Sequence, residues 1–187
     1  MLARPGATQT LSLVGATVAF ALALLFNSGS AHALTHGVSL LAGSVEEGDD
    51  RFRPTAGIEV AQGDKYAGRL FVYGREFGPV IERTYIVSAV RRLPIFGLKY
   101  VHAGFGLTAL MESTEIDFSG ADRDASRDET KYNLGAIVGM RAEVPDLGLL
   151  KLSASWESHL YLAGEAGILL STGRKQVIAI GAGYQIK

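Results

Sequence analysis

The sequence predicts an all-β fold, an up-and-down antiparallel barrel of about eight strands. Apolar and polar residues alternate with a period of two through most of the chain, no helical period survives after residue 35, and the connections alternate in length. The 187 residues include no cysteine, and 18 Lys+Arg stand against 19 Asp+Glu. Disulfides and cysteine chemistry are therefore excluded, and the near-zero net charge argues against a nucleic-acid partner.

An export signal is the first element that the sequence predicts. An apolar run covers Leu11 to Phe26, follows Arg4 and ends in the small-x-small motif Ala31-His32-Ala33. A charged start, an apolar centre and such an ending are typical of a secretory signal peptide cleaved after Ala33. An uncleaved anchor is the alternative, but the run is shorter than the roughly 20 residues that a spanning helix needs. We therefore expect a signal peptide over 1–33 and a barrel domain over 34–187.

Period-two segments predict the strands of the barrel. The clearest is 132–143, where Leu134, Val138 and Met140 on one face alternate with Gly139 and Arg141 on the other. The remaining strands are expected over 36–45, 55–62, 66–75, 81–91, 101–111 and 150–157, with a last segment ending near residue 186. A turn-like stretch at 171–175 leaves nine strands as an alternative. Eight is preferred because a barrel with both ends of the chain on one side needs an even number.

The connections predict how the barrel is oriented. Tight turns are expected at 62–65, 92–97 and 145–148, whereas 46–54 and 112–131 are expected to be longer, polar and acidic loops. Short turns at one end and longer loops at the other are typical of a membrane-spanning meander. Strands of about ten residues, tilted by about 45°, are long enough to cross a bilayer.

The polar face of the strands is expected to line the interior of a transmembrane barrel. The alternative is a secreted soluble barrel, whose apolar face would line a ligand cavity. The polar positions favour the first interpretation because they hold small residues and charges of both signs, which can pair inside a narrow barrel. The residues expected there are Glu59, Arg69, Arg75, Glu82, Arg141, Lys151 and Glu157, with His102 as a hydrogen-bonded interior residue. A polar pore is the alternative to a filled interior, although eight strands leave little room for one.

The apolar face carries Tyr66, Tyr132, Trp156 and Tyr184 towards strand ends, as in an interfacial girdle. The chain ends in Gly181-Ala-Gly-Tyr184-Gln-Ile186-Lys187. With the signal peptide and the strand pattern, these features resemble the small eight-stranded outer-membrane β-barrels of Gram-negative bacteria, such as the OmpX type, the OmpA membrane domain and the PagL-type deacylases. The resemblance implies an outer-membrane location, contact with outer-membrane lipids and lipopolysaccharide, and insertion by the barrel-assembly machinery. The chain departs from that class in ending on Lys187, where an aromatic residue is commonest.

The expected role is structural, adhesive or surface-interacting, carried by the acidic loops, and no cofactor is expected. A lipid A-modifying acyl ester hydrolase is an alternative, with Ser155, Ser158, His159 and Glu165 as candidate catalytic residues. Serine and histidine oriented by a carboxylate activate a hydroxyl for acyl transfer. The His-x-Ser motif of PagL-type enzymes is absent, however. Ser158 and His159 are adjacent on a strand and face opposite sides, while Ser155 and His159 lie about 13 Å apart along it.

A second candidate site is the run of oxygen-bearing residues in the longest loop. Asp122, Asp124, Ser126 and Asp128 are spaced as in a calcium-binding loop. Arg127 and Asn133 stand where such a loop has its glycine and its final glutamate. A solvated acidic loop is therefore the favoured interpretation, and no metal site is expected elsewhere.

Overall fold

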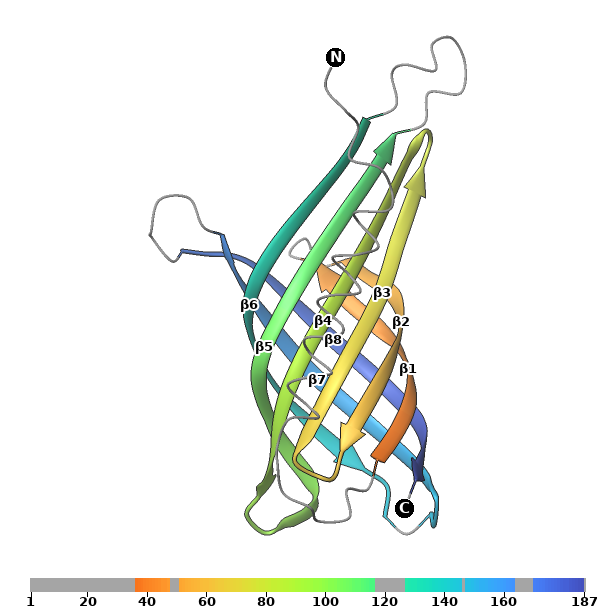
Figure 1. Ribbon diagram of the computed structural model, residues 1–187, viewed down its shortest axis with the longest axis vertical. Helices are drawn as coiled ribbons and strands as arrows, with labels where there is room; N and C mark the ends of the chain where they lie inside the picture. Colours follow the sequence, from red (N-terminus) through yellow and green to blue (C-terminus); the bar gives the residue numbers. More distant parts are fainter. Residues whose placement is uncertain (1–35, 48–50, 117–126, 146, 164–169, 187) are drawn as a thin grey trace.

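The chain forms a closed antiparallel barrel of eight strands, in which each strand pairs with its neighbours in the chain and β8 pairs with β1 (Figure 1). The computed structural model describes residues 36–47, 51–116, 127–145, 147–163 and 170–186. The strands are β1 His36–Glu47, β2 Arg51–Gln62, β3 Tyr66–Phe77, β4 Val80–Ile95, β5 Leu98–Ile116, β6 Arg127–Glu143, β7 Leu150–Ala163 and β8 Leu170–Ile186. The predicted fold and strand number are confirmed, and 171–175 belongs to β8. The expected signal peptide lies outside the described residues.

The strand register sets the width of the barrel. A path that starts at Gly37 and moves to the paired residue on each next strand returns to β1 at Glu47, ten residues further along. The path is Gly37, Ala61, Ala67, Val90, Gly106, Ile137, His159, Lys175 and Glu47. A shear of this size over eight strands corresponds to a tilt of about 43° and a mean radius of about 8 Å. The interior is therefore just wide enough for side chains.

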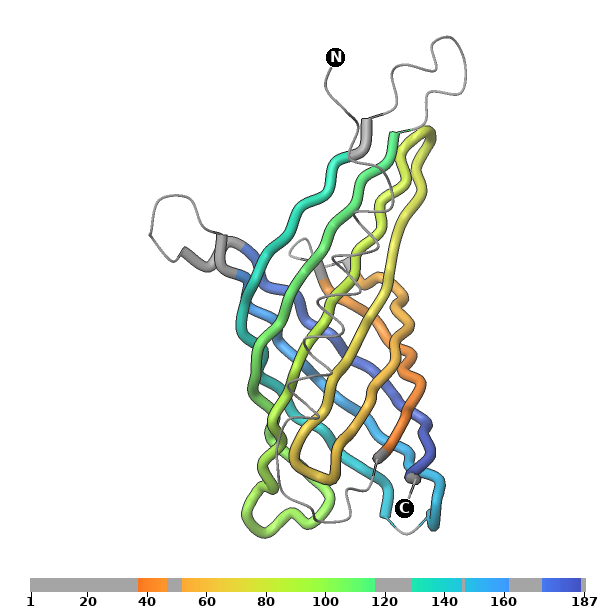
Figure 2. Tube along the Cα trace, in the orientation of Figure 1, coloured from red at the N-terminus to blue at the C-terminus, as the bar shows by residue number. Residues whose placement is uncertain are grey.

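The two ends of the barrel differ in their connections. The turn end carries the connections β2–β3, β4–β5 and β6–β7 together with the start of β1 and the end of β8; the loop end carries the other four connections (Figure 2). The β3–β4 connection at the loop end is itself a two-residue turn, Gly78–Pro79. Positive φ angles at Gly63, Gly78, Gly97 and Gly148 allow the chain to reverse in these short turns.

The strands are longer than the sequence predicts, which corrects the expected loop and turn boundaries. The predicted loop 46–54 is reduced to 48–50, and the predicted loop 112–131 to 117–126. The predicted turn 92–97 is also wrong in extent, because β4 continues to Ile95. Polar residues continue the strands at the loop end, where cross-strand ion pairs form: Arg83 Nη1 lies 3.5 Å from Glu115 Oε2 on the next strand.

The outer wall of the barrel is apolar and the inner wall is largely polar. Leu107, Leu134 and Ile180 point outward and are 69%, 71% and 68% exposed, whereas Glu59 and Arg69 are buried inside. Val138 is exposed and its neighbour Ile137 buried, as predicted for the strand 132–143. The four aromatic residues predicted to form a girdle also lie on the outer wall. This arrangement is the reverse of a soluble ligand-binding barrel, and it suits a wall that contacts lipid chains.

Candidate functional site

A buried ionic network fills the turn-end half of the interior, and Glu59 lies at its centre. The carboxylate oxygen Oε2 of Glu59 accepts hydrogen bonds of 2.6 Å from Arg69 Nε and 2.6 Å from Arg141 Nη1. Arg92 Nη2 lies 2.7 Å from the same oxygen. Each of these four side chains is at most 5% exposed. Three strands thus send a guanidinium to a single carboxylate on β2.

Two further carboxylates balance the charge of this network. Arg69 Nη1 donates a hydrogen bond to Glu157, and Arg141 Nε donates one of 3.0 Å to Glu143. Glu143 in turn lies 3.9 Å from Lys151 at the turn end. Three arginines therefore meet three glutamates, so the network is neutral, as a buried ion cluster must be to remain stable.

Little space remains between these side chains. A void of about 10 Å³ lies among Arg69, Arg92, His102 and Arg141. That volume has room for about one water molecule. His102 lines this void, so its interior position agrees with the expectation from the sequence. The expected hydrogen bond is not seen, because His102 Nδ1 has no partner among the described residues.

His159 lies between the ionic network and the part of the interior nearer the loop end. Its ring is 0% exposed, and Nδ1 lies 3.0 Å from the hydroxyl oxygen of Thr108. Nε2 lies 3.3 Å from Glu157 Oε2, and the ring stacks on Tyr161 with centroids 6.3 Å apart. The imidazole is therefore held from three sides.

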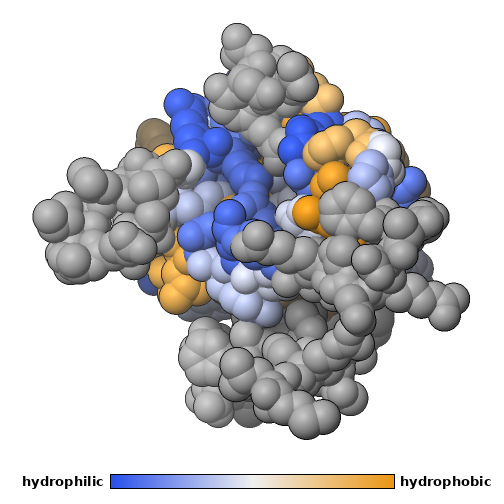
Figure 3. Space-filling view, turned by 90° about the horizontal axis from the view of Figure 1, so that it is seen from above, coloured by the Kyte–Doolittle hydropathy of each residue, from blue (hydrophilic) through white to orange (hydrophobic). Residues whose placement is uncertain are grey.

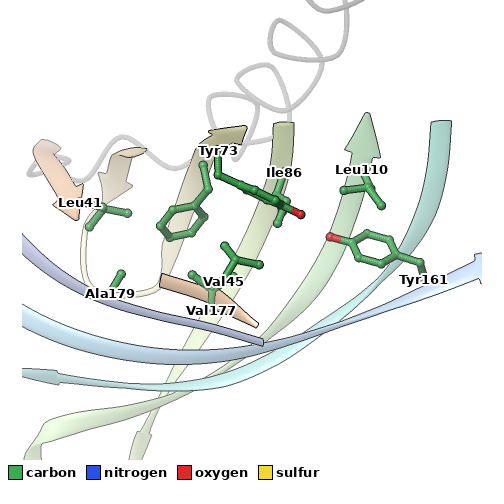
Figure 4. Close-up of a cluster of buried hydrophobic side chains, with 9 residues drawn as sticks. Leu41, Val45, Tyr73, Ile86, Leu110, Tyr161, Val177 and Ala179 are labelled. Carbon is green, nitrogen blue, oxygen red and sulfur yellow. The ribbon is translucent and has the colours of Figure 1, made fainter. Parts of the chain in front are cut away.

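An apolar layer fills the loop-end half of the interior. Figure 4 shows side chains from different strands meeting there, among them Ile86, Leu110 and Tyr161. The layer consists of Leu41, Val45, Phe71, Tyr73, Ile86, Leu110, Tyr161, Val177 and Ala179, all at most 5% exposed. A desolvated layer of this kind opposes the passage of ions because it offers them no polar partner. The described interior therefore favours the filled barrel over the polar pore.

Lys175 lies on the side of this apolar layer that faces the loop end. Lys175 Nζ donates hydrogen bonds of 2.7 Å to the Tyr73 hydroxyl and 2.8 Å to Glu112 Oε1. Seen from above, hydrophilic residues lie over the centre of the loop end, while hydrophobic ones lie towards its periphery (Figure 3). The loop end thus offers a polar surface above a closed interior.

Four strands extend beyond the others at the loop end. The pairing of β2 with β3 stops at Ala56 and Val72, although β3 continues to Phe77. The pairing of β6 with β7 stops at Leu134, although β6 begins at Arg127. The strands β3 to β6 remain paired with one another and rise above the rest of the barrel (Figure 1). We call this part the loop-end extension, residues 73–84 and 112–133 without 117–126. One edge of β3 and one edge of β6 there pair with no other strand that the structure describes.

Ion pairs on the surface of the extension hold its strands together. The guanidinium of Arg75 donates two hydrogen bonds to the carboxylate of Glu82, and its carbon lies 4.7 Å from the centroid of the Phe77 ring. Arg75 and Glu82, expected inside the barrel, are 40% and 29% exposed at this end. Their position follows from the length of β3 and β4, which carries them past the closed part of the barrel.

The structure separates the candidate catalytic residues. Ser155 and His159 lie on the inner wall, 7% and 0% exposed. Ser158 lies on the outer wall, where its hydroxyl accepts a hydrogen bond of 3.2 Å from Arg174 Nε. A barrel wall therefore lies between Ser158 and the imidazole of His159, and neither inward residue faces the lipid. Glu165 lies outside the described residues.

The candidate calcium loop falls largely outside the described part of the chain. Asp122, Asp124 and Ser126 belong to 117–126, and only the backbone of Asp128 is described, at the start of β6. Among the described residues, no group of three or more His, Asp or Glu could hold a metal ion. No helix within the described ranges is long and apolar enough to span a bilayer.

Sequence reasoning missed several interior residues. The predicted turn 92–97 includes Arg92, and the predicted interior set does not include Glu112, Tyr73 or Lys175. The continued period of two through Ser88, Val90 and Arg92 is the signal that identifies Arg92 as inward-facing.

The fold recurs in solved bacterial outer-membrane proteins, whereas the sequence matches no protein-family model and no curated protein. The chain is similar to a major outer membrane protein from Thermus thermophilus, with a TM-score of 0.58 at 16% identity over 83% of this chain and 100% of that one. Ail, the attachment invasion locus protein of Yersinia pestis, gives 0.53 at 16% identity over 83% and 100%. Outer membrane protein H (OprH) from Pseudomonas aeruginosa gives 0.51 at 15% identity over 81% and 99%. At such low identity these similarities establish the fold alone.

Proposed function

We propose that this chain is an outer-membrane barrel whose role is surface interaction, carried by the loop-end extension. The proposal rests mainly on one observation: strands β3 to β6 continue past the closed barrel and present two sheet edges that no strand within the described ranges pairs with. Unpaired strands offer backbone N–H and C=O groups to an extended segment of another protein. Binding functions commonly lie at such exposed ends of a rigid scaffold.

The apolar outer wall and the filled interior support the same proposal. A wall that exposes apolar side chains from every strand suits a bilayer, and outer-membrane barrels span theirs with such strands. In this proposal the export signal 1–33 delivers the chain, the assembly machinery reads its last residues, and lipopolysaccharide surrounds the loop end. Because the ionic network and the apolar layer oppose transport, the exposed ends remain as the place for function.

The charge of the extension bears on the class of partner. The described side chains of the extension include three basic residues, Arg75, Arg83 and Lys131. Five acidic residues outnumber them, Glu76, Glu82, Glu112, Glu115 and Glu129. Ail has been crystallised with a heparin analogue, sucrose octasulfate. A surface with an excess of acidic groups does not attract a polyanion, so we propose a protein partner that adds a strand to the edge.

The test shortens the extension without changing the barrel. Residues 75–82 are replaced by Asn-Gly, which joins the paired residues Gly74 and Arg83 by a two-residue hairpin turn. Cells that display the native protein, the shortened hairpin or Lys65→Ala are allowed to adhere to an epithelial monolayer. Lys65→Ala, at the turn end, is the matched control. We expect adhesion to fall for the shortened hairpin and to persist for the control. Equal adhesion of all three forms, with equal amounts at the surface, would refute the proposed role.

A further inference from the structure

The apolar series of the outer wall is shorter where β8 meets β1 than on β5. About ten residues of a tilted strand cross a bilayer, which gives about five outward positions. On β5 all six outward positions from Val101 to Met111 are apolar, namely Val101, Ala103, Phe105, Leu107, Ala109 and Met111. On β1 only Val38, Leu40 and Ala42 are apolar before Ser44 and Glu46 follow on the same face. On β8 the apolar series Tyr184, Ala182, Ile180 and Ile178 is followed by Gln176 and Arg174.

We call this region the seam, the outward-facing residues of β7, β8 and β1. Its polar groups are only partly satisfied by one another. Trp156 Nε1 donates a hydrogen bond of 3.1 Å to Gln176 Oε1, and Arg174 Nε donates one to Ser158. Neither Arg174 nor Glu46 makes an ion pair with any described residue. A charged side chain on the lipid-facing wall is unfavourable without a partner.

The turn-end half of the seam is hollowed. An open hollow of about 580 Å³ crosses the outer wall there and extends to the end of β6, and four of its lining residues are alanine. The lining includes Ala42, Ala142, Ala154, Ala182, Leu152 and Ile180. Small residues let a second surface approach the backbone closely, as they do between packed membrane segments.

We propose that the seam binds a second copy of this chain, related by a two-fold axis parallel to the barrel axis. Gln176 on β8 pairs with Glu46 on β1. Arg174 on β8 and Glu46 on β1 therefore both lie near the loop end of the seam. The two-fold axis places β8 of one copy against β1 of the other. Arg174 then faces Glu46 of the second copy, and Gln176 faces its Ser44, twice in each dimer. A self-complementary face of this kind is what a two-fold interface requires.

The charge pattern favours a second copy over a lipid. The phosphates of an anionic lipid would attract Arg174 but repel Glu46, and acyl chains would satisfy neither. A surface that presents both signs in the reverse order satisfies both groups at once, and the seam itself has that order. This inference is independent of the proposed surface interaction, because the loop-end extension is formed by β3 to β6.

Cross-linking in bilayers tests the contact directly, since the chain contains no cysteine. Ser44→Cys places a single thiol at the seam, and Leu107→Cys places one on the opposite wall as the matched control. At a low ratio of protein to lipid, a short bis-maleimide should capture Ser44→Cys as a dimer and leave Leu107→Cys monomeric. Equal capture of both variants, or capture of neither, would overturn the proposal.

A charge exchange separates specific pairing from general stickiness. Arg174→Glu or Glu46→Arg, each in the Ser44→Cys background, should lower the dimer fraction about fivefold or more, because two attractive contacts in each dimer become repulsive. The double variant Arg174→Glu with Glu46→Arg should restore it. Faster migration of unboiled samples on a gel verifies that each variant is folded. Single variants that dimerise as well as the native charge pair, or a double variant that fails to recover while folded, would count against the seam contact.

Discussion

Replacing Glu59 by glutamine should destabilise the barrel severely. Glu59 balances three arginines at distances of 2.6 to 2.7 Å, and all four side chains are at most 5% exposed. After the change Arg69 retains Glu157 and Arg141 retains Glu143, but the nearest carboxylate to Arg92 is Glu143 at 3.8 Å. The network then carries one uncompensated positive charge in a water-poor interior. Removing one partner of a buried ion pair costs about 3 to 5 kcal/mol, which is the loss expected here.

The measurement is a urea titration of the protein folded into phospholipid vesicles. Trp156 is the single tryptophan of the chain and lies on the outer wall, so its fluorescence reports the loss of contact with lipid on unfolding. Glu82→Gln is the matched control, since it breaks the exposed Arg75–Glu82 pair at the loop end and should cost at most about 1 kcal/mol.

A double variant tests the reason given for the loss. Adding Arg92→Met to Glu59→Gln removes the cation left without a close carboxylate. The double variant should therefore be more stable than the sum of the two single changes predicts, by about 1 kcal/mol or more. The reasoning fails if Glu59→Gln costs no more than Glu82→Gln, or if the two interior changes simply add.

Three further predictions concern the wall, the chain end and the topology. Val138→Arg places a charge on the lipid-facing wall and should lower the free energy of unfolding by about 2 to 4 kcal/mol in the same titration. Thr130→Arg, near the loop end of β6, should lower it less. Equal losses would contradict the position of the membrane. Deleting 184–187 removes Tyr184, which pairs with both Val38 and Leu150, and should leave the chain in the periplasm; normal insertion in a fractionation assay would contradict the assembly signal. Trypsin added to intact cells should cut at Arg123 or Arg127 while the barrel resists, and cleavage only after the outer membrane is opened would invert the topology.

The strand pattern predicted most of the fold because the alternation of faces is a local property of the sequence. Ala136, Val138 and Met140 against Ile137 and Arg141 were assigned to the correct walls. The turn predicted at 92–97 was too long because Pro94 is typical of turns, although β4 includes it next to an irregularity in the register. Local reasoning thus failed where a strand contains a residue that is rare in strands.

The contacts across the interior could not be predicted from the sequence. Glu59 on β2 meets Arg141 on β6, and these strands are not neighbours. Which inward residues meet depends on the shear, which is a property of the closed barrel and of no single strand. The apolar layer was missed for a related reason. Ile86 and Val87 are both apolar, so a period of two does not show which of them points inward.

The ionic network and the extension are connected through the shape of the barrel. The network joins Glu59 on β2, Arg69 on β3, Arg92 on β4, Arg141 on β6 and Glu157 on β7, five of the eight strands. Hydrogen bonds between neighbouring strands alone would allow the cross-section of the barrel to flatten. Contacts across the interior resist this flattening. The strands β3, β4 and β6 of this network continue past the apolar layer into the extension, so cross-links between them stiffen the base from which the extension rises. In the proposed surface interaction, the charges inside the barrel would act without contacting a partner themselves, by stiffening the base of the extension.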